Sequence, residues 1–241
     1  MALSILIALG FWQAKPKLVA VQVWKGFEPV RAWSPYGTEK AKTFSIDRPD
    51  GGFPDKPGAV EIIAEVDCSS AEEFPFARWS NVKGLGDFYP SSTWQDNDPK
   101  SKHAIFGLLG YPKSNEASVV LELTKGPQKP ISQPTLLHLN RWKKIAGGFR
   151  ARVRNRIIEQ QDGMRAEHAF VELILPARYE NWDVEPVISS SGSKALVVGF
   201  NESGRDREFT LMQGVDKTVQ LVIVARPFVA YPFSHIRLKP R

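Results

Sequence analysis

The run from Phe149 to Ile157 constrains the fold of this chain more than any other feature of its sequence. Every second residue in the run is arginine, and the residues between the arginines are small or mostly apolar. A period of two is that of a β-strand, whose successive side chains point to opposite faces. The sequence therefore predicts a strand with one arginine face and one mostly apolar face.

This strand is followed by a turn and a return strand, which together predict a β-hairpin. Asp162-Gly163 is a turn signal, and Glu167–Leu175 reads as a strand that ends at Pro176. A two-residue loop would mix polar and apolar residues on both faces, whereas a three-residue loop makes one face almost entirely apolar. We therefore predict the three-residue loop. The residues that it places opposite each other on the two strands are Val153 with Leu173, Asn155 with Val171, Ile157 with Ala169 and Ala151 with Leu175.

Composition and pattern favour the same class for the rest of the chain. The 241 residues include 18 Gly and 18 Pro, which favours many turns. Further strands are predicted at 17–24, 30–33, 43–46, 59–66, 104–109, 118–123, 194–200, 208–213, 218–225 and 228–238. Strands do not alternate regularly with helices, so we expect an all-β protein with minor α content. It would be an antiparallel sandwich, jelly roll or barrel of about nine to eleven strands. We expect a single domain over residues 1–241.

One helix is expected near residues 135–146. Thr135 can cap it, and four apolar residues then recur at spacings of three, namely Leu136, Leu139, Trp142 and Ile145. Gly147-Gly148 would end the helix.

Long loops or arms are expected at 27–57 and 81–99, where proline, glycine and polar residues are frequent. The apolar run of about nine residues after Met1 has no basic segment before it and is too short to span a bilayer. We expect it to form a buried strand or a docking arm, and we expect no membrane span.

The positive charge of the chain is concentrated near the arginine strand. The chain has 32 basic and 26 acidic residues, for a net charge of +6. Seven of the basic residues lie within sixteen positions, and without them 25 basic residues remain against 26 acidic ones. A concentrated patch attracts phosphates or acidic surfaces. The candidate binding residues are these seven and one aromatic residue for stacking: Arg141, Lys143, Lys144, Arg150, Arg152, Arg154, Arg156 and Phe170.

Three interpretations of the arginine face remain open. It can be a solvated face or one paired with acids from elsewhere in the chain, a contact for nucleic acid, or a contact for an acidic partner or neighbouring subunit. Arginine suits phosphate because its planar fork makes paired hydrogen bonds and stacks on bases. Within the hairpin, Glu172 is the acid that could pair with one arginine, and the register predicts Arg154.

No catalytic signature is present. Residues 107–114 resemble a phosphate-binding loop only superficially, because Pro112 precedes the lysine and has no amide hydrogen to donate. The four histidines lack metal-ligand spacing, and no Glu-x-Lys triplet of a nuclease core occurs. The single cysteine, Cys68, is expected to be a buried or half-buried free thiol. We therefore predict no catalytic residues, no metal and no cofactor.

Two functions from different classes follow. The first is a non-enzymatic structural or assembly protein, such as a coat-like shell subunit or a ribonucleoprotein subunit. It would self-assemble and contact nucleic acid (RNA or single-stranded DNA) or neighbouring subunits through the arginine-rich hairpin. The second is a soluble β-barrel or sandwich enzyme, or a ligand-binding protein, whose site is built from loop residues such as Trp94, Asp96 and His103. The expected location is the cytoplasm or an assembled particle, since no sign of secretion is evident.

Overall fold

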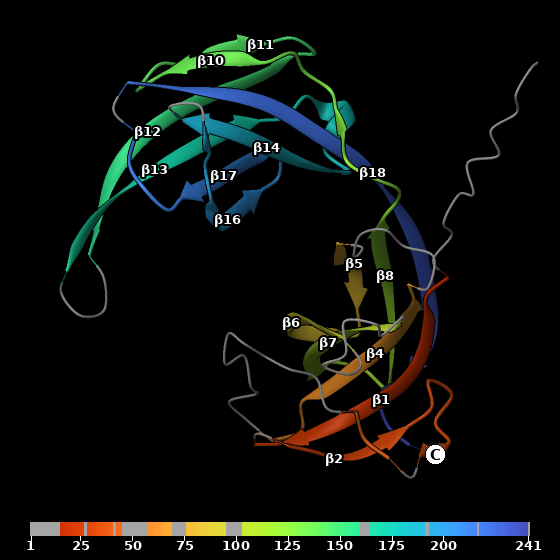
Figure 1. Cartoon of the computed structure of the whole chain (residues 1–241). Helices are drawn as coiled ribbons and strands as arrows, with labels where there is room; N and C mark the ends of the chain where they lie inside the picture. The colour runs from red at the N-terminus through yellow and green to blue at the C-terminus, as the bar shows by residue number, and fades with distance from the viewer. Residues whose placement is uncertain are drawn as a thin grey trace, which may run out of the picture. The chain divides into compact units, whose positions relative to one another are not determined.

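The computed structural model is built almost entirely of antiparallel β-strands (Figure 1), which confirms the predicted fold class. It describes residues 15–26, 28–40, 42–44, 57–68, 76–94, 103–159, 164–190, 193–215 and 217–240. These residues form two compact units: Met1–Gly126 with Phe228–Arg241, and Pro127–Pro227. We call them unit 1 and unit 2 and describe each by itself; the expectation of a single domain stays a prediction.

Unit 1 contains a sheet with the strand order β3-β2-β1-β4-β7-β6. Its other strands are β5, β8 and the end of β18. Buried side chains such as Ile62, Leu108 and Val119 join the two sets of strands in one apolar core. The strand bounds are β1 (Lys17–Lys25), β2 (Glu28–Trp33), β3 (Glu39–Lys40), β4 (Val60–Asp67), β5 (Ala77–Lys83), β6 (Leu85–Trp94), β7 (His103–Pro112) and β8 (Glu116–Thr124).

Unit 2 is a sandwich of two sheets. One sheet has the strand order β11-β12-β13-β17-β16, and the other is formed by β9, β10, β14, β15 and the first half of β18. A single apolar core lies between them, with Val153 and Leu173 from the first sheet and Leu221 from the second. The bounds are β9 (Lys129–Pro130), β10 (Thr135–His138), β11 (Lys143–Ile145), β12 (Phe149–Glu159), β13 (Arg165–Ile174), the short 3-10 helix η1 (Ala177–Tyr179), β14 (Trp182–Ser190), β15 (Ser193–Lys194), β16 (Val197–Ser203), β17 (Asp206–Leu211) and β18 (Thr218–Arg237).

The prediction of a helix near residues 135–146 is wrong. This segment forms β10 and β11 with a turn between them, and Asn140 has a positive φ of 61°. Leu137 is fully buried while Leu136 and His138 are exposed, which is the period of a strand. The spacing of three between apolar residues fitted a helix, but pairing with β18 and β12 offers this short segment more stabilisation than helical hydrogen bonds alone.

Gly147-Gly148 turns the chain between β11 and β12 rather than ending a helix. Both residues have positive φ, at 85° and 87°, which favours glycine. A side chain at Gly147 would also approach the ring of Phe149 to 3.3 Å. The pair therefore makes a tight hairpin that places β11 at the edge of the sheet.

The prediction of a long loop over residues 81–99 is also wrong for the part that the structure describes. Residues 77–94 form β5 and β6, joined at Gly84, which has a φ of 85°. The sequence analysis also predicted no strand where β14 lies, at Trp182–Ser190. Of the loop predicted at 27–57, residues 28–33 and 39–40 form β2 and β3. The apolar run after Met1, residues 45–56 and the Asp162-Gly163 turn lie outside the described residues.

The hairpin of β12 and β13 forms, but its predicted register is wrong by two residues. Val153 lies opposite Val171 and Ala151 opposite Leu173, so five residues separate the paired ends Glu159 and Arg165. A shift of two keeps every side chain on the face that was predicted. Ala151 and Val153 are fully buried in the core, and the arginines lie on the opposite face.

Candidate nucleic-acid interface

Three arginines of β12 form an ion-pair network with two glutamates from neighbouring strands. Arg152, Arg154 and Arg156 project from the face of β12 that is turned away from the core. Glu172 projects from β13, and Glu208 lies opposite it on β17. We call these five residues the arginine–glutamate network.

Glu172 is the centre of this network. Its carboxylate accepts hydrogen bonds from Arg152 Nε at 2.8 Å and from Arg152 Nη2, and it forms ion pairs with Arg154 and Arg156. Glu208 contacts Arg156 Nη2 at 2.8 Å and Arg154 Nη2 at 3.4 Å. The prediction that Glu172 pairs with Arg154 is thus confirmed, but Glu172 also holds two further arginines.

The network neutralises most of the charge on the arginine face. Three guanidinium groups share two carboxylates, and the Glu172 side chain is more buried than any of the three arginines. Arginines held in this way are less available to phosphate, because a phosphate must compete with carboxylates that already accept their hydrogen bonds. This geometry favours the interpretation in which the face is paired with acids from elsewhere in the chain.

Phe170 is not available as a stacking platform. Only 6% of its surface is exposed, and the guanidinium of Arg156 lies over its ring at 4.3 Å from the centroid. His168, opposite Arg156, places Nδ1 at 3.0 Å from the carbonyl oxygen of Leu211. The Phe170 ring therefore offers no free face to a ligand.

The other four predicted basic residues lie at the β11 edge of the same sheet. Arg141, Lys143, Lys144 and Arg150 are all exposed, and within the described part of the chain none has a carboxylate partner. Lys144 lies directly opposite Arg150 on the paired strands. We call this group, together with Trp142, the basic edge.

Trp142 is the residue at this edge that sequence reasoning missed. It is 38% exposed and lies under two guanidinium groups, with Arg152 at 4.7 Å and Arg150 at 5.2 Å from its ring centroid. The sequence placed it on the apolar face of a helix, which concealed its exposure. A strand period counted from Ile145, which is buried, would have placed Trp142 and Lys144 on the outer face.

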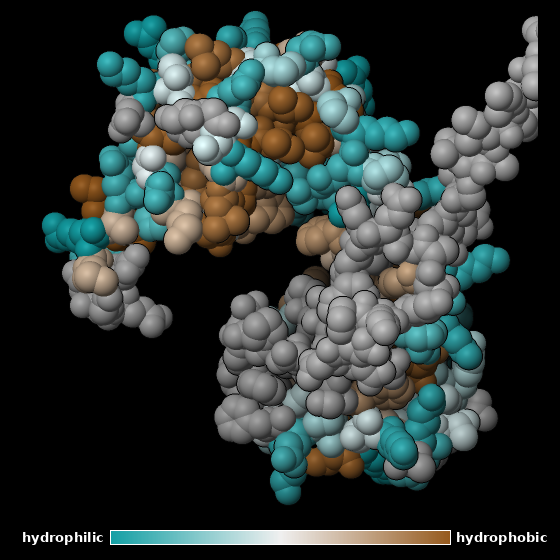
Figure 2. All heavy atoms as spheres, in the orientation of Figure 1, coloured by the Kyte–Doolittle hydropathy of each residue, from teal (hydrophilic) through white to brown (hydrophobic). Residues whose placement is uncertain are grey.

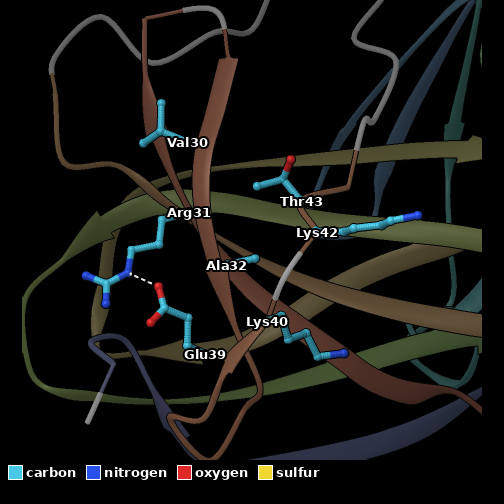
Figure 3. Close-up of a pocket in the computed structure, with 7 residues that line it drawn as sticks. All are labelled: Val30, Arg31, Ala32, Glu39, Lys40, Lys42 and Thr43. Carbon is cyan, nitrogen blue, oxygen red and sulfur yellow. Dashed lines mark hydrogen bonds and ion pairs between the residues drawn. The ribbon is translucent and has the colours of Figure 1, made fainter.

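Unit 1 contains a polar hollow of about 520 Å³ beside β2 and β3 (Figure 3), lined among others by Arg31, Glu39, Lys40 and Lys42. Arg31 Nε donates to Glu39 Oε1 at 2.8 Å, and this bond holds the pKa of Glu39 below its ordinary value. The two side chains are 49% and 61% exposed. A pair so open to water lacks the desolvated setting that makes carboxylates reactive.

The remaining chemical candidates are separate from one another. Cys68 is a buried free thiol, as predicted, and burial raises its pKa to about 11, helped by the charge of Asp67. His103 Nδ1 lies 3.4 Å from a carboxylate oxygen of Glu65. Asp96 and the side chain of Trp94 lie outside the described residues, so the structure does not test the predicted loop-built site. Where side chains are described, no three His, Cys, Asp or Glu residues gather as metal ligands.

Among the residues with described positions, no helix is long and apolar enough to cross a membrane. Compared with known proteins, the chain matches no family model, no curated protein and no solved structure.

Proposed function

We propose that this protein is a non-enzymatic binding protein whose unit 2 contacts single-stranded nucleic acid through the basic edge. The observation that carries the proposal is a combination of two features. Four exposed cations have no carboxylate partner among the residues that the structure describes, and the ring of Trp142 beside them is exposed. Proteins that hold single strands combine cations for the phosphates with aromatic rings for the bases. A subunit of a ribonucleoprotein or of a coat-like shell would use such a surface.

The proposed binding site is the basic edge and not the arginine face itself. Arg152 belongs to both, since it pairs with Glu172 and also lies over Trp142. Arg154 and Arg156 have two carboxylates within ion-pair distance, so their role is to hold the sheet together. The contribution to phosphate binding falls to Arg141, Lys143, Lys144 and Arg150.

The test is a titration of a fluorescently labelled single-stranded RNA, and of a DNA of the same sequence, at several salt concentrations. Four phosphate contacts predict a slope of about −3 for log K against log salt. The double variant Lys143→Ala and Lys144→Ala should reduce the slope to about −1.4. Trp142→Ala should weaken binding by about tenfold or more and leave the slope unchanged, because a stacked base carries no charge.

The matched control is Lys129→Ala, which removes an exposed lysine on β9 in the same unit. It should leave both affinity and slope close to those of the original chain. Absence of binding at low salt, or a slope that the lysine double variant does not change, would overturn the proposal.

A further inference from the structure

A polar hollow lies beside the basic edge, on the outer face of the same sheet. Its volume is about 300 Å³, at the lower end of the range for small-molecule sites. Trp142 lines it from the basic edge, and Ile174 of β13, Asp206 of β17 and Ser203 of β16 line it farther along the sheet. The exposed tryptophan ring therefore belongs to the basic edge and to this hollow at once.

The charge of the hollow is opposite to that of the basic edge. Four carboxylates and one guanidinium line it. A phosphate is therefore repelled from the hollow and attracted to the basic edge beside it. Figure 2 shows mainly hydrophilic side chains where Figure 1 draws β11. A nucleotide whose phosphate lies on the basic edge can thus place only its uncharged parts, the sugar or the base, in the hollow.

Asp206 supplies the carboxylate that a ligand in the hollow can reach without displacing an ion pair. Of the other three carboxylates, Glu172 and Glu208 hold arginines of the arginine–glutamate network. Glu202 lies 3.3 Å from Arg207 Nε. Asp206 is exposed, and no ion pair joins it to any residue that the structure describes. Its two oxygens are therefore available as hydrogen-bond acceptors.

One row of residues across the sheet connects the basic edge to Asp206. Arg150 on β12 lies opposite Ile174 on β13, and Ile174 lies opposite Asp206 on β17. Two strand spacings, about 10 Å, separate the cation from the carboxylate. A nucleotide along this row has its phosphate at Arg150 and its base over the half-buried Ile174, beside Trp142. The far edge of the base then faces Asp206.

We propose that the hollow binds a guanine base of the single strand, whose Watson–Crick edge donates two hydrogen bonds to the carboxylate of Asp206. This inference rests on the proposed function and adds a base preference to it. Guanine presents two neighbouring donors on that edge, N1–H and the 2-amino group, and a carboxylate accepts such a pair with its two oxygens. Adenine and cytosine present a ring acceptor beside the amino group, and uracil has a carbonyl on each side of its N–H. Each of these three bases therefore turns an acceptor toward the carboxylate, which disfavours it.

The experiment is a titration of labelled oligouridine RNAs that carry one central guanine, adenine, cytosine or inosine, with plain oligouridine as the reference. The guanine RNA should bind about fivefold or more tightly than the adenine, cytosine and plain RNAs, which is the size of one good paired contact. Inosine keeps N1–H but lacks the amino group, so the affinity of its RNA should lie between those of the guanine and adenine RNAs.

Asp206→Asn replaces one carboxylate oxygen by a donor and should abolish the preference for guanine. The variant should bind plain oligouridine about as tightly as the original chain does, which verifies that it is folded. Asp87→Asn makes the same change at an exposed residue of unit 1 and should keep the preference. If no RNA binds, the proposed function fails and this inference fails with it. If all the RNAs bind equally tightly, or if Asp206→Asn still prefers guanine, the inference alone is overturned.

Discussion

The two edges of the sheet β11-β12-β13-β17-β16 differ in every property that controls what can bind there. The β11 edge is three residues long, and two of them are exposed lysines. The β16 edge exposes valine, leucine and phenylalanine side chains instead. Lysines on an edge repel a second strand and attract phosphate, whereas an uncharged apolar edge admits a strand and gives phosphate nothing to bind. One sheet therefore presents two surfaces suited to different partners.

The largest expected effect concerns the region between the two edges. Glu172→Gln removes the charge that holds three guanidinium groups, so the arginines would repel one another on a partly buried face. We expect the free energy of unfolding to fall by about 2 kcal/mol. Chemical denaturation measures it. Glu180→Gln, at an exposed position outside the network, should change stability by no more than about 0.5 kcal/mol. An equal fall in the free energy of unfolding of the two variants would mean that the arginine–glutamate network does not stabilise the fold.

Glu172→Gln should also make the arginine face more similar to the basic edge in its affinity for phosphate. With one carboxylate gone, the arginines become more available to phosphate, and the salt dependence of RNA binding should steepen by up to about 0.7 for each arginine released. The salt titration described above measures the slope. An unchanged slope would show that the arginine face stays closed to nucleic acid even without its central glutamate.

The smallest expected effect comes from giving the β11 edge the uncharged character of the β16 edge. Lys143→Val with Lys144→Thr removes the two charges that protect β11, so self-association should become detectable at high concentration. Because β11 has only three residues, we expect a weak effect, seen as a rise in the weight-average mass by light scattering. Lys129→Val is the control. No rise in mass would indicate that the shortness of β11, rather than its lysines, protects this edge.

Much of the fold could be predicted from local pattern. The alternation in β12 placed Ala151 and Val153 in the core and the arginines on the outer face, and both placements are confirmed. The face was predicted correctly although the register was wrong, because an error of two residues preserves the side on which a strand residue lies. The number of residues in the loop after Glu159 could not be decided from the turn signal alone.

The helix prediction failed for a different reason. Apolar residues at spacings of three between Leu136 and Ile145 fit a helix when they are read alone, but two of them, Leu136 and Trp142, are exposed in the structure. In β10 the fully buried residue is instead Leu137, which lies opposite Val219 of β18. Only the partner strand reveals which period is in use, because a short apolar segment fits both.

The candidate site could be predicted in composition but not in organisation. The sequence by itself determined that this chain is all-β, that a strand of unit 2 carries arginine on one face, and that its excess charge is local. Tertiary structure decided which of those charges are free, since Glu208 reaches Arg154 and Arg156 from more than fifty residues further along the chain. Side-chain periodicity is a local property of the backbone. Charge compensation depends on which strands become neighbours, and strand order follows from packing across the whole unit.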